Sequence, residues 1–209
     1  YISQLMHAQT PIAYYPFNGN ANDAGGNSLN GTIIGSPTFT TDRFGNANSA
    51  IAFDGNTANR VEVPDNALLR QPNITITAWV KVNTASGSIQ TFVDKPLSPC
   101  TADSWHFGTE NSNFSAWLFR TTGCGDLVQA TSTLAINTWA YVAMTADANN
   151  QQLKLYINGS LVSTQAYAGT ISYDNNAMYI GVSLENNANN YPLNGAIDEL
   201  NIYGTVLTA

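Results

Sequence analysis

The amino-acid sequence predicts an all-β fold in which two antiparallel sheets pack face to face. Several segments alternate apolar and polar residues with a period of two, the pattern of a strand with one buried face. The clearest is Ile74–Val82. Such runs are bounded by Asn, Gly, Asp and Pro every ~8–12 residues, a spacing typical of sandwiches and barrels. A helical apolar period extends over no more than about two turns anywhere. Two packed sheets are the simplest way to bury strands that are apolar on one side.

The individual strands are clearest in the second half of the chain. Trp139–Met144 is a continuous run of β-favouring residues, and Leu153–Ile157 alternates with a period of two. The segment Asp147–Asn150 predicts a hairpin turn between these two runs. Asn158-Gly159 predicts a type I′ turn, because both residues tolerate positive φ. This turn joins Leu153–Ile157 to the next predicted strand, Leu161–Gln165.

The chain is predicted to form one domain preceded by a short tail. No internal repeat and no Pro- or Ser-rich linker divides residues 12–209. Residues 1–11 resemble the end of a secretory signal peptide, with Ala8 at the cleavage position and Gln9 as the mature N-terminus. The basic and most of the apolar part of such a peptide are absent, so a linker or vector-derived segment explains the tail equally well. We exclude residues 1–11 from the fold.

The composition indicates a folded protein and excludes several classes of function. The 209 residues include 7 Lys and Arg against 14 Asp and Glu, a net charge of −7. This balance disfavours nucleic-acid binding, because neutralising phosphates needs clustered Lys and Arg. Apolar residues make up 44% of the chain, which excludes a disordered composition. No stretch approaches the ~18 consecutive apolar residues of a membrane helix. Few charges and many aromatic and amide side chains suit a secreted or cell-surface β protein.

The two cysteines, Cys100 and Cys124, are predicted to form a disulfide that closes a loop. Their spacing does not match a zinc motif, which needs further Cys or His nearby. A disulfide implies an oxidising compartment. The alternative is a pair of buried, reduced cysteines that act as small hydrophobic side chains.

Five blocks of sequence together resemble a known family. They occur in the family's order and cover about residues 12–205, nearly the whole chain. The blocks are Tyr14–Asp23, Ala52–Gly55 with Val61–Pro64, Ile74–Lys81, Asn137–Ala143 with Leu155–Val162, and Leu193–Tyr203. They are similar to the laminin G-like, concanavalin A-like jelly-roll domains of bacterial secreted proteins. The resemblance implies a two-sheet jelly-roll β-sandwich, a fold that hosts lectins, adhesion modules and hydrolases.

The resemblance also implies a structural calcium ion where the first loop meets the last strand. Calcium takes six to eight oxygen ligands from carboxylates, amides and carbonyls, and the loop after Phe17 is rich in them. The ligands carried over from the family are Asn20, Asp23 and Asp198, with Asp54 as a further candidate. The alternative is that these Asp and Asn residues only form Asx turns.

Candidate sugar-binding residues combine aromatic rings with amide side chains, because a ring buries C–H surface while amides bond hydroxyls. We expect Trp105, Trp117, Tyr173 and Tyr191 to contact a ligand. Neighbouring candidates are His106, Arg120, Asn175, Asn176, Asn186, Asn187, Asn189 and Asn190. The alternative is that these rings belong to the core, and for Trp79 and Trp139 we expect the core.

The sequence gives no sign of a catalytic site. Some concanavalin A-like folds cleave glycans with carboxylates that alternate along one strand. Asp198 and Glu199 are adjacent, so their side chains point to opposite faces. The remaining carboxylates are scattered along the chain. We therefore expect no enzyme but a lectin-like or adhesion module that binds carbohydrate or a protein receptor. The alternatives are a protein-binding or spacer domain of a surface adhesin and, behind it, a glycan hydrolase.

Overall fold

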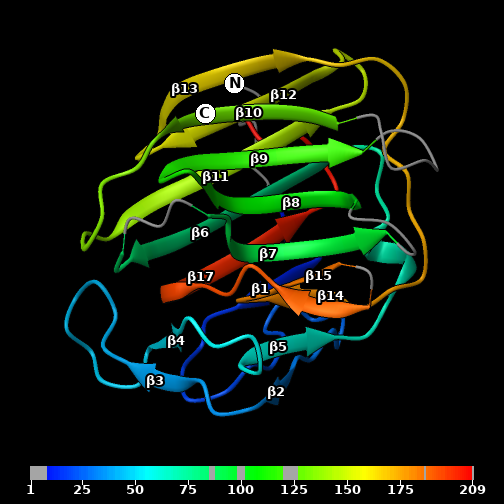
Figure 1. Cartoon of the computed structure of the whole chain (residues 1–209). Coiled ribbons are helices and arrows are strands. Elements are labelled where there is room, and N and C mark those ends of the chain that lie inside the picture. Colours follow the sequence, from blue (N-terminus) through cyan, green and yellow to red (C-terminus); the bar gives the residue numbers. More distant parts are fainter. Residues whose placement is uncertain (1–8, 85–87, 98–101, 120–126, 186, 209) are drawn as a thin grey trace, which may run out of the picture.

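The computed structural model describes residues 9–84, 88–97, 102–119, 127–185 and 187–208. Two antiparallel sheets lie one in front of the other (Figure 1), so the predicted jelly-roll sandwich is confirmed. The predicted cysteine pair and the candidates Arg120 and Asn186 lie outside the described residues. Within these residues, the one helical segment is the short 3₁₀ turn η1 (Ala67–Leu69). No helix in this part of the chain is long and apolar enough to cross a membrane.

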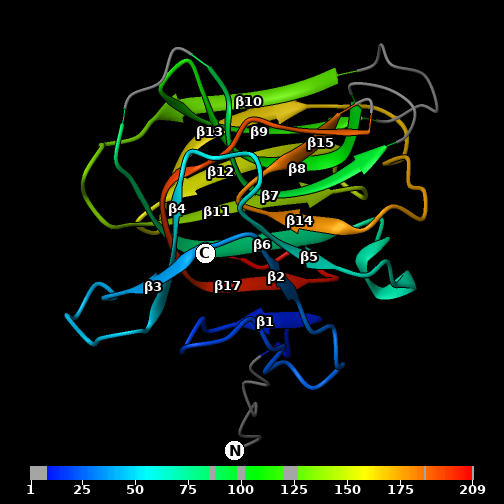
Figure 2. The same ribbon diagram turned by 60° about the horizontal axis from the view of Figure 1, so that its bottom comes forward.

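The larger sheet has eight strands, and its centre is built from the segments that the sequence marks most clearly. Their order is β13-β12-β11-β6-β17-β4-β3, and β1 also pairs with β17. Figure 2 shows β1 alongside β17 at the margin of the molecule. The bounds are β13 (Ser160–Ala166), β12 (Gln152–Ile157), β11 (Ala140–Asp147), β6 (Ile74–Val82), β17 (Asn194–Tyr203), β4 (Ala50–Asp54), β3 (Thr38–Thr40) and β1 (Ala13–Tyr15).

The second sheet has seven strands in the order β10-β9-β8-β7-β14-β5-β2. A separate hairpin of β15 (Ser183–Glu185) and β16 (Ala188–Asn190) contacts this sheet through β7. The bounds are β10 (Leu127–Thr133), β9 (Asn113–Phe119), β8 (Ala102–Glu110), β7 (Gln90–Leu97), β14 (Met178–Ile180), β5 (Arg60–Val63) and β2 (Thr32–Ile34).

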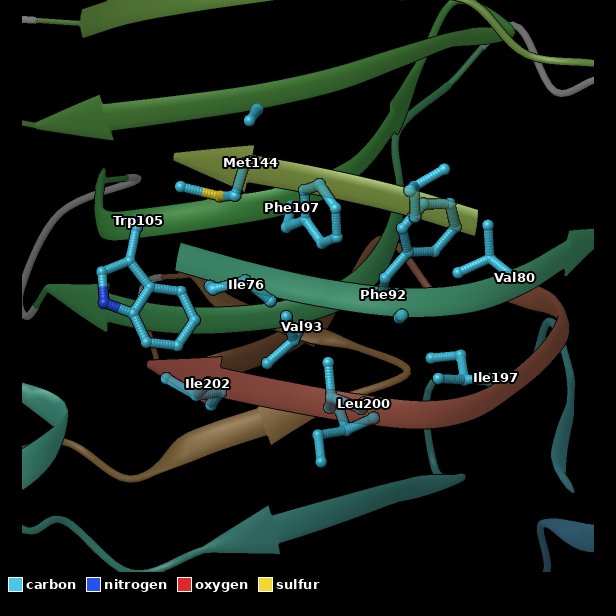
Figure 3. Packing of buried hydrophobic residues seen from close by; sticks show 14 of the residues in the cluster. Ile76, Val80, Phe92, Val93, Trp105, Phe107, Met144, Ile197, Leu200 and Ile202 are labelled. Carbon is cyan, nitrogen blue, oxygen red and sulfur yellow. The ribbon is translucent and has the colours of Figure 1, made fainter. Parts of the chain in front are cut away.

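The core lies between the two sheets and follows the predicted alternation. In β6, Ile76 and Val80 are buried and point toward the seven-stranded sheet (Figure 3). That sheet contributes Phe92 and Phe107, whose rings meet edge to face with centroids 5.8 Å apart. Edge-to-face packing satisfies the ring quadrupoles while burying a large apolar area. Burial of this one face sets the register of each strand.

Trp79 and Trp139 do not lie in the core, so this expectation is wrong. Both side chains are half-buried. Trp79 stands between Ala78 and Val80, which are buried, and the period of two turns it to the outer face of the eight-stranded sheet. There its ring packs against Tyr141, with centroids 5.4 Å apart. The period-two alternation of residues 74–82 indicates that Trp79 faces outward. The expectation of a core position followed from the apolar character of Trp instead.

The two predicted turns are present. Asn158 and Gly159 connect β12 to β13 with φ angles of 50° and 80°, as a type I′ turn requires. The Asn158 side chain also accepts a hydrogen bond of 3.0 Å from the backbone N–H of Tyr141. Asp147 accepts hydrogen bonds from the N–H groups of Asn149 and Asn150, which closes the turn between β11 and β12.

Candidate functional site

A β-bulge in β8 places Asp103 on the outer face of the seven-stranded sheet. Lys95 of β7 lies opposite Trp105, and the next residue, Pro96, lies opposite Asp103. Lys95 and Pro96 are consecutive, whereas their partners Trp105 and Asp103 are two residues apart. Ser104 is therefore the extra residue of the bulge. Strict alternation would turn Asp103 inward with Trp105. The bulge instead brings it to the face that carries His106.

This outer face holds a groove of about 280 Å³. It lies on β8, β9 and β10, the strands drawn in front of the other sheet in Figure 1, with the segment from β15 to Tyr191 on its other side. Carboxylates, an amide and aromatic rings therefore face one cavity. The lining residues are Ile89, Asp103, Glu110, Trp117, Phe119, Leu127, Gln129, Glu185 and Tyr191.

Trp117 is the central aromatic residue of the groove. Its ring is nearly buried, with 6% of its surface exposed. It lies opposite His106 on β8 and opposite Gln129 on β10. The indole Nε1 donates a hydrogen bond of 2.8 Å to Asp103 Oδ2. One tryptophan thus contributes an apolar ring to the groove and fixes the carboxylate beside it.

Polar side chains on β8, β9 and β10 form a hydrogen-bonded row beside Trp117. Gln129 Nε2 donates to Ser115 Oγ over 3.0 Å and also to Glu110 Oε2. These bonds hold the Gln129 amide and the Glu110 carboxylate against the sheet. The remaining acceptor positions of both groups are available to a ligand with hydroxyl donors.

Tyr191 and Glu185 approach the groove from the segment that follows β14. Tyr191 has a φ of 54°, which is rare for a bulky side chain and marks a conformation held by its surroundings. Its carbonyl accepts a hydrogen bond of 3.0 Å from the N–H of Thr91. Burial raises the pKa of Glu185, and a hydrogen bond with the Tyr191 side chain partly offsets the rise.

Behind the groove wall lies a buried cluster of Asp94, Asp103 and His106. All three side chains are at most 2% exposed. Burial and the neighbouring Asp103 carboxyl raise the pKa of Asp94 well above its usual value. Burial raises the pKa of Asp103 to about 7, and it lowers the pKa of His106 to about 3. A low dielectric environment disfavours the charged form of each group, which explains the opposite directions for acid and base.

Of the four predicted ligand-binding residues, the structure brings Trp117 and Tyr191 together. Trp105 is fully buried between the sheets, so a ligand at the surface does not reach it. Tyr173 packs against the core, and its hydroxyl donates a hydrogen bond of 2.7 Å to the carbonyl of Gln71. The nearby Asn176 carbonyl accepts a hydrogen bond from the buried Lys95, so that loop has a structural role.

The predicted calcium ligands are engaged in protein contacts. Asp23 accepts backbone N–H groups from Tyr14, Gly25 and Leu29, which organises the first loop. Asn20 Oδ1 accepts the N–H of Asn22, as in an Asx turn. Asp54 Oδ1 likewise accepts hydrogen bonds from the backbone N–H of Asn56 and from the side-chain amide of Asn59.

Asp198 has a cationic partner in the protein. Arg43 places its guanidinium nitrogens 2.9 Å from Asp198 Oδ2 and 3.0 Å from Glu199 Oε2. The expectation that these two carboxylates point to opposite faces is therefore wrong, because β17 is irregular between Asp198 and Asn201 and Glu199 has a φ of 49°. Burial raises the pKa of Asp198 to about 6, Glu199 adds to the rise, and Arg43 opposes it. Asp23 thus accepts hydrogen bonds that hold the first loop, and Asp198 forms an ion pair with Arg43.

The sequence interpretation missed most of the groove's polar residues. Asp103, Glu110 and Glu185 are far apart in the sequence, yet all three line one cavity. The period-two pattern of residues 104–110 signals the outward position of Glu110. The bulge that turns Asp103 outward depends on the pairing of β7 with β8, which no local pattern records.

Comparison with known proteins identifies the family of the chain and relates its fold to solved structures. A family model described as "Concanavalin A-like lectin/glucanases superfamily" matches residues 53–209. No curated protein gave a significant match.

Several solved structures share the fold at low sequence identity. The binding domain of Paraclostridial Mosquitocidal Protein 1 is 17% identical with a TM-score of 0.72, covering 90% of this chain and 47% of that one. The binding domain of botulinum neurotoxin DC in complex with SialylT is 16% identical with a TM-score of 0.72, covering 95% and 48%. The chain therefore spans about half the length of these toxin domains.

A third solved structure matches over nearly its whole length. Domain 4 of AbnA, an extracellular GH43 arabinanase from Geobacillus stearothermophilus solved with arabinotriose, is 21% identical with a TM-score of 0.68. The match covers 97% of this chain and 96% of that domain. At these identities the three structures establish the shared fold.

Proposed function

The chain belongs to the concanavalin A-like lectin/glucanase superfamily, and we propose that it is a non-catalytic carbohydrate-binding module. Its ligand lies in the groove on the outer face of the seven-stranded sheet. The module belongs to a secreted or cell-surface protein, in keeping with the low charge and the extracellular arabinanase among the structures of this fold.

One observation carries this proposal: Trp117 and fixed hydrogen-bonding side chains share a single groove. A sugar ring presents patches of C–H, which an indole covers, and a rim of hydroxyls, which need donors and acceptors. Gln129 and Glu110 are held in place by their mutual hydrogen bond, so binding requires little ordering of side chains. Two structures of this fold were solved with carbohydrate-related ligands, arabinotriose and SialylT.

A glycan array, run with and without EDTA, tests the proposal. We expect binding to a related set of oligosaccharides. The best oligosaccharide is then titrated calorimetrically into Gln129→Ala and Glu185→Gln, which change the groove surface. We expect each substitution to weaken binding by about tenfold, which is the loss of one good hydrogen bond to a ligand.

Tyr141→Phe is the matched control, because Tyr141 lies on the outer face of the other sheet. This variant should bind like the wild type. Equal affinity of all variants would place the glycan elsewhere, and no glycan binding by the wild type would contradict the proposal in favour of a protein receptor.

Glycan hydrolysis is a second candidate because three carboxylates line the groove. Asp103, with its pKa raised to about 7, is about half protonated at neutral pH, which leaves a substantial fraction in the form that a general acid requires. We favour binding, since Asp103 is 2% exposed and its Oδ2 is engaged by Trp117. Release of reducing ends from the array's best oligosaccharide, lost in Glu110→Gln and Glu185→Gln, would support hydrolysis.

A calcium ion at the edge of the sandwich stays a proposal. The residues that line a cavity there include three carboxylates and two amides: Asp42, Asp198, Glu199, Asn18 and Asn46. Calcium bound there would compete with Arg43 for Asp198. We expect Ca²⁺ to raise the melting temperature relative to EDTA and Asp198→Ala to remove this rise. A melting temperature insensitive to Ca²⁺ would contradict the proposal.

A further inference from the structure

We propose that Asp94, Asp103 and His106 form a binding site for a divalent transition-metal ion, with Zn²⁺ as its probe. The three residues offer one ligand atom each, and these atoms all lie within 4.8 Å of one another. His106 Nδ1 is 3.9 Å from Asp94 Oδ1. Ligand atoms around tetrahedral zinc lie about 3.3 Å apart, given bonds of about 2.0–2.1 Å, so small side-chain shifts close the site.

The ligand atoms are buried, and within the described part of the chain they have few hydrogen-bonding partners. Both ring nitrogens of His106 lack a hydrogen-bond partner there. The Asp94 and Asp103 carboxyls have each other, and Asp103 Oδ2 also accepts the indole N–H. Asp94 has the Ser183 hydroxyl and the N–H of Leu184 nearby. Buried polar atoms are rarely left unpaired in native proteins, and each needs an explanation. A bound cation would engage one ring nitrogen of His106 together with an oxygen of each carboxylate, all usual metal ligands.

The charges of the cluster also favour a cation. Two carboxylates lie side by side, and among the described residues neither pairs with Lys or Arg. The adjacent Lys95 turns to the other face of β7 and pairs with Asp65 instead. A dipositive ion would neutralise both carboxylates. The competing state without metal is a pair of carboxyls that share one proton.

The donor set selects the kind of metal. Calcium needs six to eight oxygens, and an imidazole nitrogen is a poor ligand for it. One imidazole with two carboxylates suits zinc and other divalent first-row ions. Three protein ligands leave a coordination position for water or substrate, as in catalytic zinc sites. Asp103 also lines the groove, so an ion on its carboxylate lies at the groove wall.

The surroundings of the cluster orient two of the three ligands. Trp117 donates its indole N–H to Asp103 Oδ2 and stacks its ring on His106. Gly108 leaves the space beside His106 Nε2, since a Cβ at this position would lie 2.8 Å from that atom. Partners of this kind fix the orientation of metal ligands and raise their affinity. Trp117 is therefore a positioning residue for the site.

Zinc retention by the purified chain tests the site directly. The protein is incubated with excess Zn²⁺, passed through gel filtration and assayed for zinc by mass spectrometry. We expect a single Zn²⁺ per wild-type chain and none in Asp94→Asn or His106→Gln. With Co²⁺ in place of Zn²⁺, we expect the visible absorption bands of tetrahedral cobalt. Asp198→Asn, at the predicted calcium site, is the matched control and should retain zinc.

Circular dichroism shows whether Asp94→Asn and His106→Gln are folded. If they are not, Trp117→Phe tests the site instead, because it keeps all three ligands. We expect its zinc affinity to fall about 10–100-fold. A folded wild-type chain that retains no zinc, or variants that retain as much as the wild type, would overturn the proposal in favour of proton sharing. Since no glycan is present, this outcome is independent of carbohydrate binding.

Discussion

The indole of Trp117 stacks on the imidazole of His106, with ring centroids 3.9 Å apart and planes inclined by 12°. The two residues face each other across β8 and β9. The same indole donates its N–H to Asp103. Trp117 thus joins the groove to the buried cluster behind it, and a change at this position should affect both.

Trp117→Phe should lower the free energy of unfolding by about 1–3 kcal/mol. Phenylalanine keeps an aromatic ring but lacks the indole N–H, so the buried Asp103 Oδ2 loses its donor, and an unsatisfied buried acceptor carries a cost of that size. Urea unfolding followed by circular dichroism measures the change. Trp139→Phe is the control. Trp139 is half-buried, and its ring centroid lies 5.6 Å from Lys81 Nζ. Equal losses in both variants would contradict a special role for the indole N–H.

Arg43→Met should destabilise the fold by about 1–3 kcal/mol at pH 8, because it leaves the buried Asp198 carboxylate without its cation. The loss should shrink toward pH 5. The folded-state pKa of Asp198 is raised to about 6, and removing Arg43 raises it further. Both folded proteins bind more protons at Asp198 than the unfolded chain, but the variant does so up to a higher pH. Its stability therefore continues to fall above about pH 6, where that of the wild type levels off.

Urea unfolding of wild type and Arg43→Met at several pH values between about 5 and 8 checks the sign of this dependence. Arg60→Met serves as a control, since Arg60 pairs with the more exposed Glu62 at 3.6 Å. A pH-independent difference between wild type and Arg43→Met would show that Asp198 does not titrate in this range.

Gly108→Ala should cost about 1–3 kcal/mol of stability, the usual penalty for overpacking. A Cβ at this position would lie 2.1 Å from the carbonyl oxygen of Gln90 on β7 and 2.8 Å from His106 Nε2. The backbone contact cannot be relieved by rotating a side chain, so β7 and β8 must separate. Thermal unfolding measures the loss, and an unchanged melting temperature would contradict the close approach of the two strands.

Asn158→Ala should lower stability by about 1 kcal/mol, since it places a residue with little tolerance for positive φ in the tight turn. It also removes the acceptor of the Tyr141 N–H. Asn149→Ala, in the neighbouring turn, is the control, because only its backbone N–H takes part there. Similar unfolding midpoints for wild type and Asn158→Ala would argue against a type I′ requirement.

The sequence predicted the strands well where one face is buried. Ile74–Val82 forms β6 over the expected residues, because alternating apolar side chains have one stable arrangement, with Ile76 and Val80 inward. The Asn158-Gly159 turn was equally clear, since its φ angles favour a few residue types. Local pattern and local conformational preference agree at these positions.

The site was predicted less completely. Trp117 and Tyr191 were recognised as candidates, but Trp105 proved to be core and Asp103 was not grouped with them. Trp105 and Asp103 are two residues apart, and alternation assigns them the same face. The bulge at Ser104 separates them, and it exists because β7 and β8 pair in a shifted register.

What the sequence determined by itself is the two-sheet sandwich, because burial of one face of each strand depends only on the local order of apolar and polar residues. The tertiary structure alone decided which polar residues meet. Asp94, Asp103 and His106 come from two strands, and Arg43 reaches Asp198 across more than half of the chain. Such pairings depend on register and strand order, and these are set by the packing of the whole core.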